Sequence, residues 1–206
     1  MRYWIIVLTI IVFLGTTSNA SNNDQDRSGL LLKSKSIVSA KIFKMVPYEK
    51  LPPQTAQPIK KEFYQKILLD FNKHFKNRSN DITYLSDNLK VKGVITFPQD
   101  FKPSKKYPII IHNRGGFYER GRIVTTVRVG RDYANKGYII FEPQYRGVAG
   151  GEGREEFGGR EVNDIINLLK IAKSFSFVDE KNTFIIGRSR GGMMTYLAIK
   201  HGAKVN

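Results

Sequence analysis

Residues 183–194 have the sequence Thr-Phe-Ile-Ile-Gly-Arg-Ser-Arg-Gly-Gly-Met-Met, and this stretch says most about the fold. Its first four residues have the apolar pattern of a buried strand, and residues 193–201 have the pattern of a helix. Between them, three residues form the spacing G-x-S-x-G: Gly187, Ser189 and Gly191. A glycine-rich turn could have that spacing by chance. A chance turn would not need to follow a buried strand and precede a helix, however, and this one does both. We therefore predict a tight elbow in which the flanking glycines avoid clashes and the Ser189 hydroxyl is raised as a nucleophile.

Two positions near this serine could supply an oxyanion hole. The main-chain N–H of Arg190 starts the helix that leaves the elbow, where it can face a developing negative charge. The second position is the loop after the apolar strand at residues 107–112, which contains Gly115 and Gly116. Glycines there would let the backbone approach a substrate closely. Taken alone, that loop is equally well explained as an ordinary glycine-rich turn.

Working outward, the chain alternates strand and helix patterns. Residues 82–85 and 91–97 flank the turn-forming cluster 86–88 and predict an antiparallel hairpin. Three buried strands follow, at 107–112, 138–141 and 183–186, with residues 178–182 predicted as a turn before the last. One helix is predicted to end at about Lys136, because Gly137 terminates it. Two further helices are predicted at 160–173 and 193–201. This order predicts an α/β fold with parallel strands joined by crossovers.

The residues before the hairpin have a different texture. Residues 21–60 are polar, and four prolines argue against long regular elements there. Residues 60–76 predict an amphipathic helix, whose apolar positions are Phe63, Ile67, Phe71 and Phe75, with Tyr64 and Leu68 beside them. We expect this helix to pack on the domain behind it, with a membrane-surface helix as the alternative.

The N-terminus has the three parts of a secretory signal. Arg2 gives a positive start, residues 4–14 are apolar apart from Thr9, and small polar residues lead to Ala20. The apolar run is short of the roughly 20 residues that span a bilayer. We therefore expect a signal peptide at 1–20, cleavage after Ala20, export to the periplasm or the extracellular space, and no stable membrane insertion afterwards. An uncleaved anchor is the alternative.

Composition excludes several classes of protein and site. Apolar content of 41% and charged content of 25% are ordinary for a globular protein. The absence of cysteine excludes disulfides, thiolate metal sites and a cysteine nucleophile. Only three histidines are present, at positions 74, 112 and 201, so we expect no metal and no cofactor. The net charge of +16 comes from scattered residues without a nucleic-acid motif, so we expect no nucleic-acid partner.

The loop at residues 147–159 is rich in glycine but lacks the nucleotide-binding patterns. Four charged residues in and beside it could line a substrate cleft or close the loop by local ion pairs: Arg146, Glu152, Glu155 and Glu156. Local ion pairs are the commoner outcome. Asp164, on the following helix, is expected to be structural, and Met193 and Met194 are expected to pack against the sheet.

Five segments follow one another over about residues 82–202. They are VKGVITFP, KYPIIIHNRGG, GYIIFEPQYRG, REVNDIINLLK and VDEKNTFIIGRSRGGMMTYLA. This ordered set resembles the α/β-hydrolase-fold serine peptidases of the prolyl oligopeptidase (S9) type. The resemblance implies that Ser189 is the nucleophile, that the N–H of Arg190 is one oxyanion donor and that Gly115 or Gly116 is the other. The usual His-Gly-Gly motif of the family reads Arg114-Gly115-Gly116 here, which leaves the second donor open between the two glycines.

The partners of the serine are not found in the order that the fold uses. An Asp or Glu and then a His should follow the nucleophile, but residues 190–206 contain neither acid. His201 would lie about 18 Å away along the helix, whereas a base must lie within about 3 Å. His74 and His112 precede the serine, and Asp179 lies at the opposite end of its strand. We therefore expect the N-terminal part of a hydrolase, with the C-terminal strands missing and no activity of its own.

Three parts and one leading function follow. We expect a signal peptide at 1–20, a lead-in at 21–80 with one amphipathic helix, and a truncated α/β-hydrolase domain at 81–206. The leading function is a serine-type peptidase that cleaves peptides through an acyl-enzyme on Ser189. The alternatives are a carboxylesterase that acts on small esters with the same elbow, and a non-catalytic basic binding module.

Overall fold

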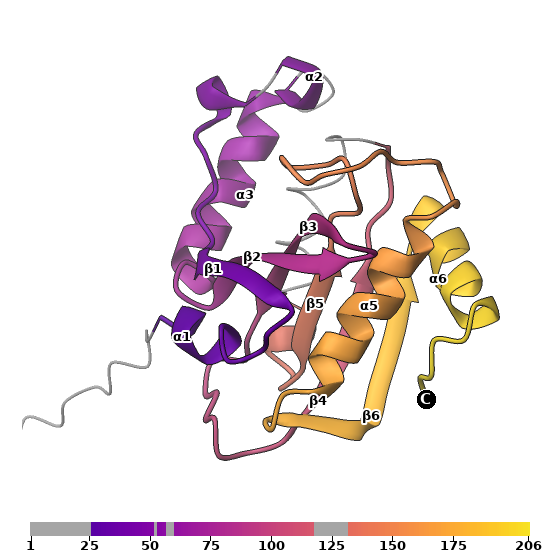
Figure 1. Cartoon of the computed structure of the whole chain (residues 1–206). Coiled ribbons are helices and arrows are strands. Elements are labelled where there is room, and N and C mark those ends of the chain that lie inside the picture. Colours follow the sequence, from indigo (N-terminus) through magenta and orange to yellow (C-terminus); the bar gives the residue numbers. More distant parts are fainter. Residues whose placement is uncertain (1–25, 52, 57–59, 118–131) are drawn as a thin grey trace, which may run out of the picture.

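The computed structural model describes residues 26–51, 53–56, 60–117 and 132–206 (Figure 1). The signal predicted at 1–20 and most of the helix predicted before Gly137 lie outside these residues. The strands are β1 (Ile37–Ile42), β2 (Ser79–Ser86), β3 (Leu89–Thr96), β4 (Tyr107–Asn113), β5 (Ile139–Pro143) and β6 (Val178–Gly187). The helices are α1 (Ser28–Leu31), α2 (Pro53–Ala56), α3 (Lys61–His74), α5 (Val162–Lys173) and α6 (Arg190–Lys200), with a 3₁₀ turn at Tyr48–Lys50.

The six strands form one mixed sheet in the order β1-β2-β3-β5-β4-β6. Strands β4, β5 and β6 are parallel, while β1, β2, β3 and β5 pair antiparallel in succession. The predicted arrangement, parallel strands preceded by an antiparallel hairpin, is confirmed. The hairpin turns through Asp87 and Asn88, with φ of 49° and 65°. Two consecutive positive φ angles are the geometry of a tight two-residue hairpin turn, which Asp and Asn tolerate better than most residues.

Strand β1 was not predicted. It comes from the proline-containing lead-in and pairs antiparallel with β2. The pairing includes a side-chain hydrogen bond of 2.9 Å from Ser39 Oγ to Thr83 Oγ1. A short, half-exposed edge strand has a weak sequence pattern, because only one of its faces needs to be apolar.

Strand β6 is longer than predicted. Residues 178–182, predicted as a turn, belong to the strand as a bulge, because pairing with β4 passes from Tyr107–Val178 to Ile109–Thr183. Within the bulge the Asp179 carboxylate accepts hydrogen bonds from Lys181 N at 3.1 Å and Asn182 Nδ2 at 2.7 Å. The turn chemistry is therefore present, but it bends the strand without ending it.

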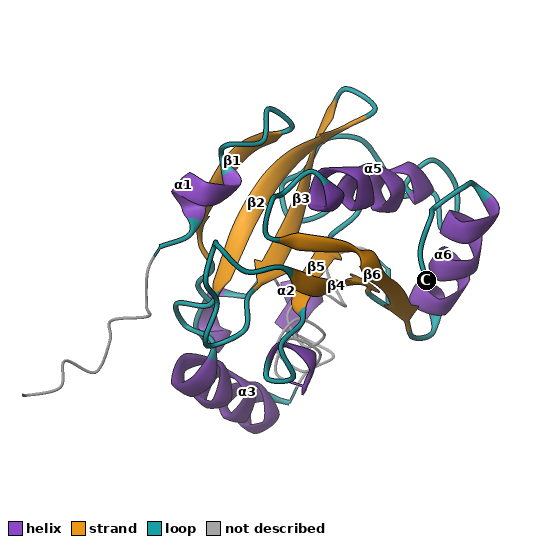
Figure 2. Ribbon diagram, turned by 90° about the horizontal axis from the view of Figure 1, so that it is seen from below, coloured by secondary structure: helices purple, strands orange, loops and turns teal. Residues whose placement is uncertain are grey.

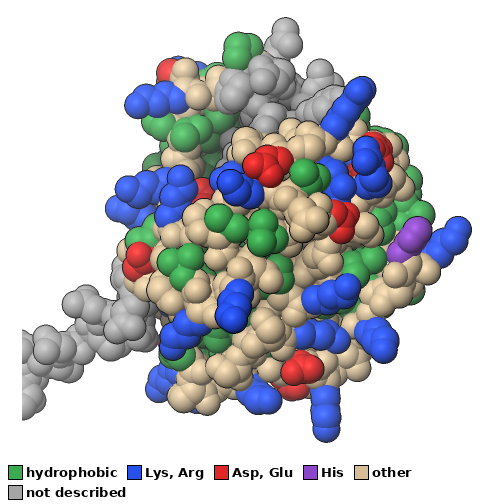
Figure 3. Space-filling view, viewed as in Figure 1, with side chains coloured by type: hydrophobic (Ala, Val, Ile, Leu, Met, Phe, Trp, Pro, Cys, Tyr) green, Lys and Arg blue, Asp and Glu red, His purple; other side chains and the backbone are tan. Residues whose placement is uncertain are grey.

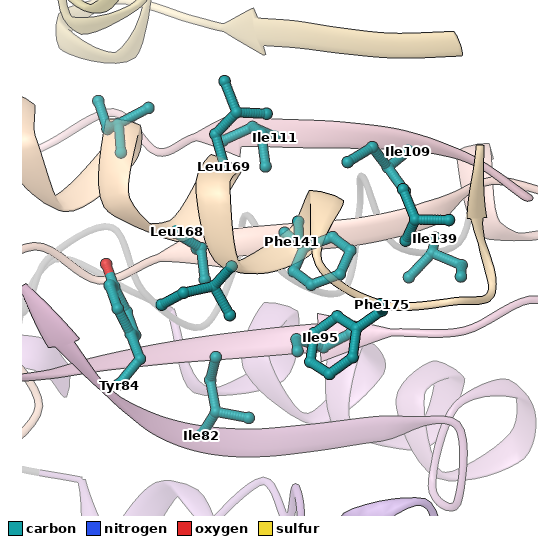
Figure 4. Close-up of a cluster of buried hydrophobic side chains, with 14 of the residues drawn as sticks. Ile82, Tyr84, Ile95, Ile109, Ile111, Ile139, Phe141, Leu168, Leu169 and Phe175 are labelled. Carbon is teal, nitrogen blue, oxygen red and sulfur yellow. The ribbon is translucent and has the colours of Figure 1, made fainter. Parts of the chain in front are cut away.

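Helices cover both faces of the sheet, with α5 and α6 on one side and α3 on the other (Figure 2). Between α5 and the sheet lies the larger part of the core, where Leu168 and Leu169 meet the apolar side chains of several strands (Figure 4). On the opposite face, Phe71 of α3 and Phe75, which directly follows the helix, pack against Val94, Ile110 and Ile140 of the sheet. The prediction that this helix packs on the domain is confirmed.

The buried face of α3 departs from the predicted stripe only at its N-terminal end. Phe63 is 53% exposed, and its neighbour Tyr64 is buried instead. The Tyr64 hydroxyl donates a 2.6 Å hydrogen bond to the carbonyl of Val46. No helix within the described ranges is long and apolar enough to cross a membrane.

Candidate active site

Ser189 lies at the junction of β6 and α6 and is exposed to solvent. Its backbone has φ 56° and ψ −128°, a conformation that is unfavourable for a residue with a side chain. The next two turns of the chain are closed by hydrogen bonds from Gly191 N to Arg188 O at 3.0 Å and from Gly192 N to Ser189 O at 2.9 Å. The predicted elbow is therefore present, with a strained serine at its apex.

The glycines around the elbow are required by close backbone contacts. A Cβ on Gly187 would overlap the main-chain oxygen of Gly191. A Cβ on Gly191 would overlap the main-chain oxygen of Asn113, at the end of β4. The two positions therefore let the elbow fold back on itself and pack against the neighbouring strand.

The loop after β4 lies directly against the serine. A Cβ on Gly115 would lie 3.0 Å from Arg188 O and 3.6 Å from Ser189 Cβ. Gly116, the next residue, has φ 75° and is exposed. The structure thus brings both candidate donor segments together: the loop glycines on one side of Ser189, and Arg190 on the other, at the start of α6. The first N–H groups of a helix have no acceptor within it.

Sheet topology explains why these segments meet. Strand β4 has β5 on one side and β6 on the other, so the chain reverses direction across the sheet at β4. Asn113 at the end of β4 is level with Gly187 at the end of β6. Loops from the carboxyl ends of such strands diverge and leave a crevice that serves as a ligand site in α/β proteins.

The charged residues in and beside the loop 147–159 have different partners. Arg146 pairs with buried Asp164 at 2.7 Å and with Asp87 at 2.8 Å. Together these contacts tie the hairpin turn to α5, and the structural role predicted for Asp164 is confirmed. Glu152 accepts a 2.8 Å hydrogen bond from Lys90 N, and Glu156 pairs with Arg160 at the surface.

Glu155, in the same loop, makes contacts of a different kind. Its side chain is completely buried, and its Oε1 atom lies 2.6 Å from Arg114 Nη2 and 2.7 Å from Arg190 Nη1. It therefore joins the loop after β4 to the helix after the elbow. Burial lowers the pKa of Arg114, and the neighbouring Glu155 opposes that shift. Sequence reasoning missed this contact because no local spacing relates the three residues.

The three histidines lie in different elements, and the contacts described for them are with residues other than Ser189. His201 follows the last residue of α6, at the end of the helix opposite the serine. His74 ends α3, with its Nε2 atom 3.8 Å from Asp70. His112 is buried, and its Nδ1 is 2.7 Å from Glu142 Oε1 on the adjacent strand. That pair was also missed, although a charged residue at the end of the apolar run 138–141 was a signal for it.

The part of the chain that the structure describes contains no group of three or more His, Asp or Glu residues placed to hold a metal ion. With or without a metal, a serine hydroxyl can attack a carbonyl carbon when two donors stabilise the oxyanion and a base accepts the proton. The described residues contain the hydroxyl and both donor segments.

Comparison with known proteins agrees with this geometry. Residues 129–205 match the sequence model of the prolyl oligopeptidase family, Peptidase_S9. This part of the chain is therefore similar in sequence to the prolyl oligopeptidase family. The chain is 36% identical over 126 residues to the uncharacterized peptidase YtmA of Bacillus subtilis, covering 60% of this chain and 46% of that protein. It is 30% identical over 117 residues to dipeptidyl-peptidase 5 of Porphyromonas endodontalis, covering 53% of this chain and 17% of that protein. The chain spans less than half the length of either relative.

Solved structures support the fold assignment. The α/β hydrolase GrgF from Penicillium superposes with a TM-score of 0.52 at 18% identity, over 62% of this chain and 43% of that one. An acylaminoacyl peptidase in complex with a chloromethyl ketone superposes with a TM-score of 0.50 at 24% identity, over 66% and 23%. Both likenesses indicate the fold alone, an α/β-hydrolase sheet.

Proposed function

We propose that this chain carries the nucleophile and the oxyanion hole of a serine peptidase, with Ser189 as the nucleophile. The observation that carries the proposal is the strained elbow, which presents an exposed serine between the Gly115–Gly116 loop and the start of α6. The match to the prolyl oligopeptidase family, and relatives named as peptidases, support peptides as the substrate class.

In the proposed reaction, Ser189 Oγ bonds to the carbonyl carbon of the scissile peptide while a base takes the hydroxyl proton. The N–H of Arg190 and an N–H of Gly115 or Gly116 stabilise the oxyanion. The C–N bond then breaks, and the amine leaves with the proton from the base. Water attacks the remaining acyl ester, which releases the acid and restores the serine.

The proposal includes inactivity of the 206-residue chain by itself. His201 follows the end of α6 opposite Ser189, His74 lies beside Asp70 at the end of α3, and His112 is paired with the buried Glu142. A serine without a base is a weak nucleophile. We therefore expect no turnover by the chain unless a base is added.

Covalent labelling with a fluorophosphonate tests the nucleophile and the missing base together. Ser189 Oγ would bond to phosphorus, the P–F bond would break, and fluoride would leave. We expect slow labelling of the full chain, acceleration by free imidazole acting as the base, and none in Ser189→Ala. Fast labelling without imidazole that Ser189→Ala abolishes would refute inactivity, and no Ser189-dependent labelling with imidazole would refute the nucleophile.

The imidazole-assisted reaction also separates the alternatives. A peptidase should release the aniline from a peptide anilide, whereas a carboxylesterase should act on a p-nitrophenyl ester only. A basic binding module should bind nucleic acid or anionic lipid in a salt-dependent way that survives Ser189→Ala. On the face shown in Figure 3, Lys and Arg side chains are scattered among acidic and uncharged ones, which favours the hydrolase.

We also propose that residues 1–20 direct export, with cleavage after Ala20. Mass spectrometry of the chain recovered from the exporting host would give an N-terminus at Ser21. An intact N-terminus in the membrane fraction would instead favour the uncleaved anchor.

A further inference from the structure

One carboxylate oxygen connects the two segments that flank the serine. Glu155 Oε1 accepts hydrogen bonds from Arg114 Nη2 at 2.6 Å and from Arg190 Nη1 at 2.7 Å. The three side chains are almost completely buried, with exposures of 0%, 1% and 2% for Glu155, Arg114 and Arg190. Charged hydrogen bonds in such surroundings are short and strong, and losing one partner leaves an uncompensated charge.

Each of the two arginines belongs to, or directly precedes, a candidate oxyanion donor. Arg114 immediately precedes Gly115, and its Nη1 donates to the Gly115 carbonyl at 3.3 Å. Arg190 immediately follows Ser189, and its Nη1 donates to the Gly116 carbonyl at 3.2 Å. The carboxylate therefore bridges Arg190, whose own N–H is a proposed donor, and Arg114, which directly precedes the proposed donor segment.

The surroundings hold this bridge in one place. Arg190 Nη2 also pairs with Glu161 Oε1 at 2.7 Å, so among the described residues two guanidinium groups face two carboxylates. The Arg190 guanidinium lies over the rings of Tyr145, Phe157 and Phe117, at 5.1, 4.9 and 5.3 Å from their centroids. Arg114 also donates through Nε and Nη2 to the Gln144 carbonyl at 3.2 and 2.9 Å.

We propose that Glu155 is a positioning residue that sets the distance between the two oxyanion donor segments. This rests on the proposed function, in which both segments stabilise one oxyanion. Donors stabilise a transition state only when they are fixed before the charge develops, and two loops from different strands need a common anchor to achieve this.

The test compares Glu155→Gln and Glu155→Asp with Asp164→Asn. Asp164 is an equally buried carboxylate that pairs with Arg146 away from the elbow, so its variant controls for the loss of a buried ion pair. The readout is the rate of imidazole-assisted fluorophosphonate labelling of Ser189 in the folded fraction of the full chain. We expect Glu155→Gln to slow labelling about tenfold or more, as removal of an oxyanion donor does. Labelling of Glu155→Asp should lie between that variant and the wild type, and Asp164→Asn should label at the wild-type rate.

Hydrogen exchange measured by mass spectrometry provides a second readout that needs no reaction. Glu155→Gln should raise deuterium uptake in peptides covering residues 112–117 and 187–192, whereas Asp164→Asn should raise it around the hairpin turn and α5. Unchanged uptake at both donor segments in Glu155→Gln would overturn the proposal. So would wild-type labelling by that variant, or equal slowing by Asp164→Asn.

Two further outcomes also bear on the positioning role of Glu155. If Glu155→Gln does not fold, Glu155→Asp decides alone: slowed labelling supports the positioning role, and the wild-type rate overturns it. If the wild type itself shows no Ser189-dependent labelling, the proposed function fails, and the exchange measurement still decides whether Glu155 holds the two segments together.

Discussion

Ser189 combines an ordinary side chain with a backbone conformation that favours glycine. At φ 56° and ψ −128°, its Cβ is crowded by the backbone, and such strain costs on the order of 1–3 kcal/mol. The residues around it repay that cost by fixing the turn, since Gly187 and Gly191 allow backbone contacts that no side chain would permit. The strain is therefore local to the residue that the proposed reaction uses.

Replacing Ser189 should reveal this strain. Ser189→Gly removes the Cβ, so we expect it to be about 1 kcal/mol more stable than Ser189→Ala, which keeps it. Urea unfolding of the two variants gives the free energies of unfolding. Equal stabilities would mean that the serine conformation is not strained.

A pair of adjacent glycines allows a matched comparison. Gly191→Ala should destabilise the chain by about 2–4 kcal/mol, because the new methyl group would overlap the Asn113 carbonyl. At Gly192 a Cβ would lie 3.7 Å from the nearest atom, Gly187 O. Gly192→Ala should therefore be neutral or stabilising by up to about 1 kcal/mol, as in other helix interiors. Thermal or urea unfolding measures both, and a comparable loss in the two variants would contradict the packing described at the elbow.

Among the elements, α3 shows how far a periodic pattern can be trusted. Its position and its packing on the sheet were predicted from the spacing of four apolar residues. The face that it buries was predicted less well, since Phe63 is exposed and Tyr64 is buried. Spacing alone cannot distinguish neighbouring apolar positions, because the choice depends on the shape of the surface beneath.

Two positions on α3 should differ sharply in their contribution to stability. Phe71 is 1% exposed and Leu69 is 72% exposed. Phe71→Ala should cost about 3–5 kcal/mol through the cavity it leaves, whereas Leu69→Ala should change stability by less than about 0.5 kcal/mol. Denaturant midpoints compare the two, and a small loss in Phe71→Ala would mean that α3 is only loosely attached to the sheet.

Across the described part of the molecule, several carboxyl groups have contacts that favour the ionised form, whereas burial raises the pKa of Asp164. Hydrogen bonds from Arg160 lower the pKa of Glu156 to about 2. Ser28 lowers the pKa of Asp26, and Asn182 lowers that of Asp179. At Asp87 burial acts to raise the pKa, but hydrogen bonds from Arg146 and two asparagines outweigh it and the pKa is lowered.

The pH dependence of stability follows from these shifts. A carboxyl whose pKa is lower in the folded state contributes stability above its unfolded value, about 4, and loses it as the pH falls through the folded value. We therefore expect the unfolding temperature to drop as the pH falls from about 4 toward the Glu156 value of about 2. The difference between wild type and Glu156→Gln should shrink over the same range. A difference that stays constant in acid would show that Glu156 does not titrate with folding.

The sequence by itself determined the order of the main strands and helices, and the elbow at Ser189, because these depend on apolar periodicity and on residues within five positions of one another. The tertiary structure decided the pairing of β1, the bulge in β6 and the buried face of α3. It also placed Glu155 between Arg114 and Arg190, 41 and 35 residues away, and His112 beside Glu142, 30 residues away. Local spacing does not encode such contacts. They form only when strands and loops far apart in the chain are brought to the same edge of the sheet.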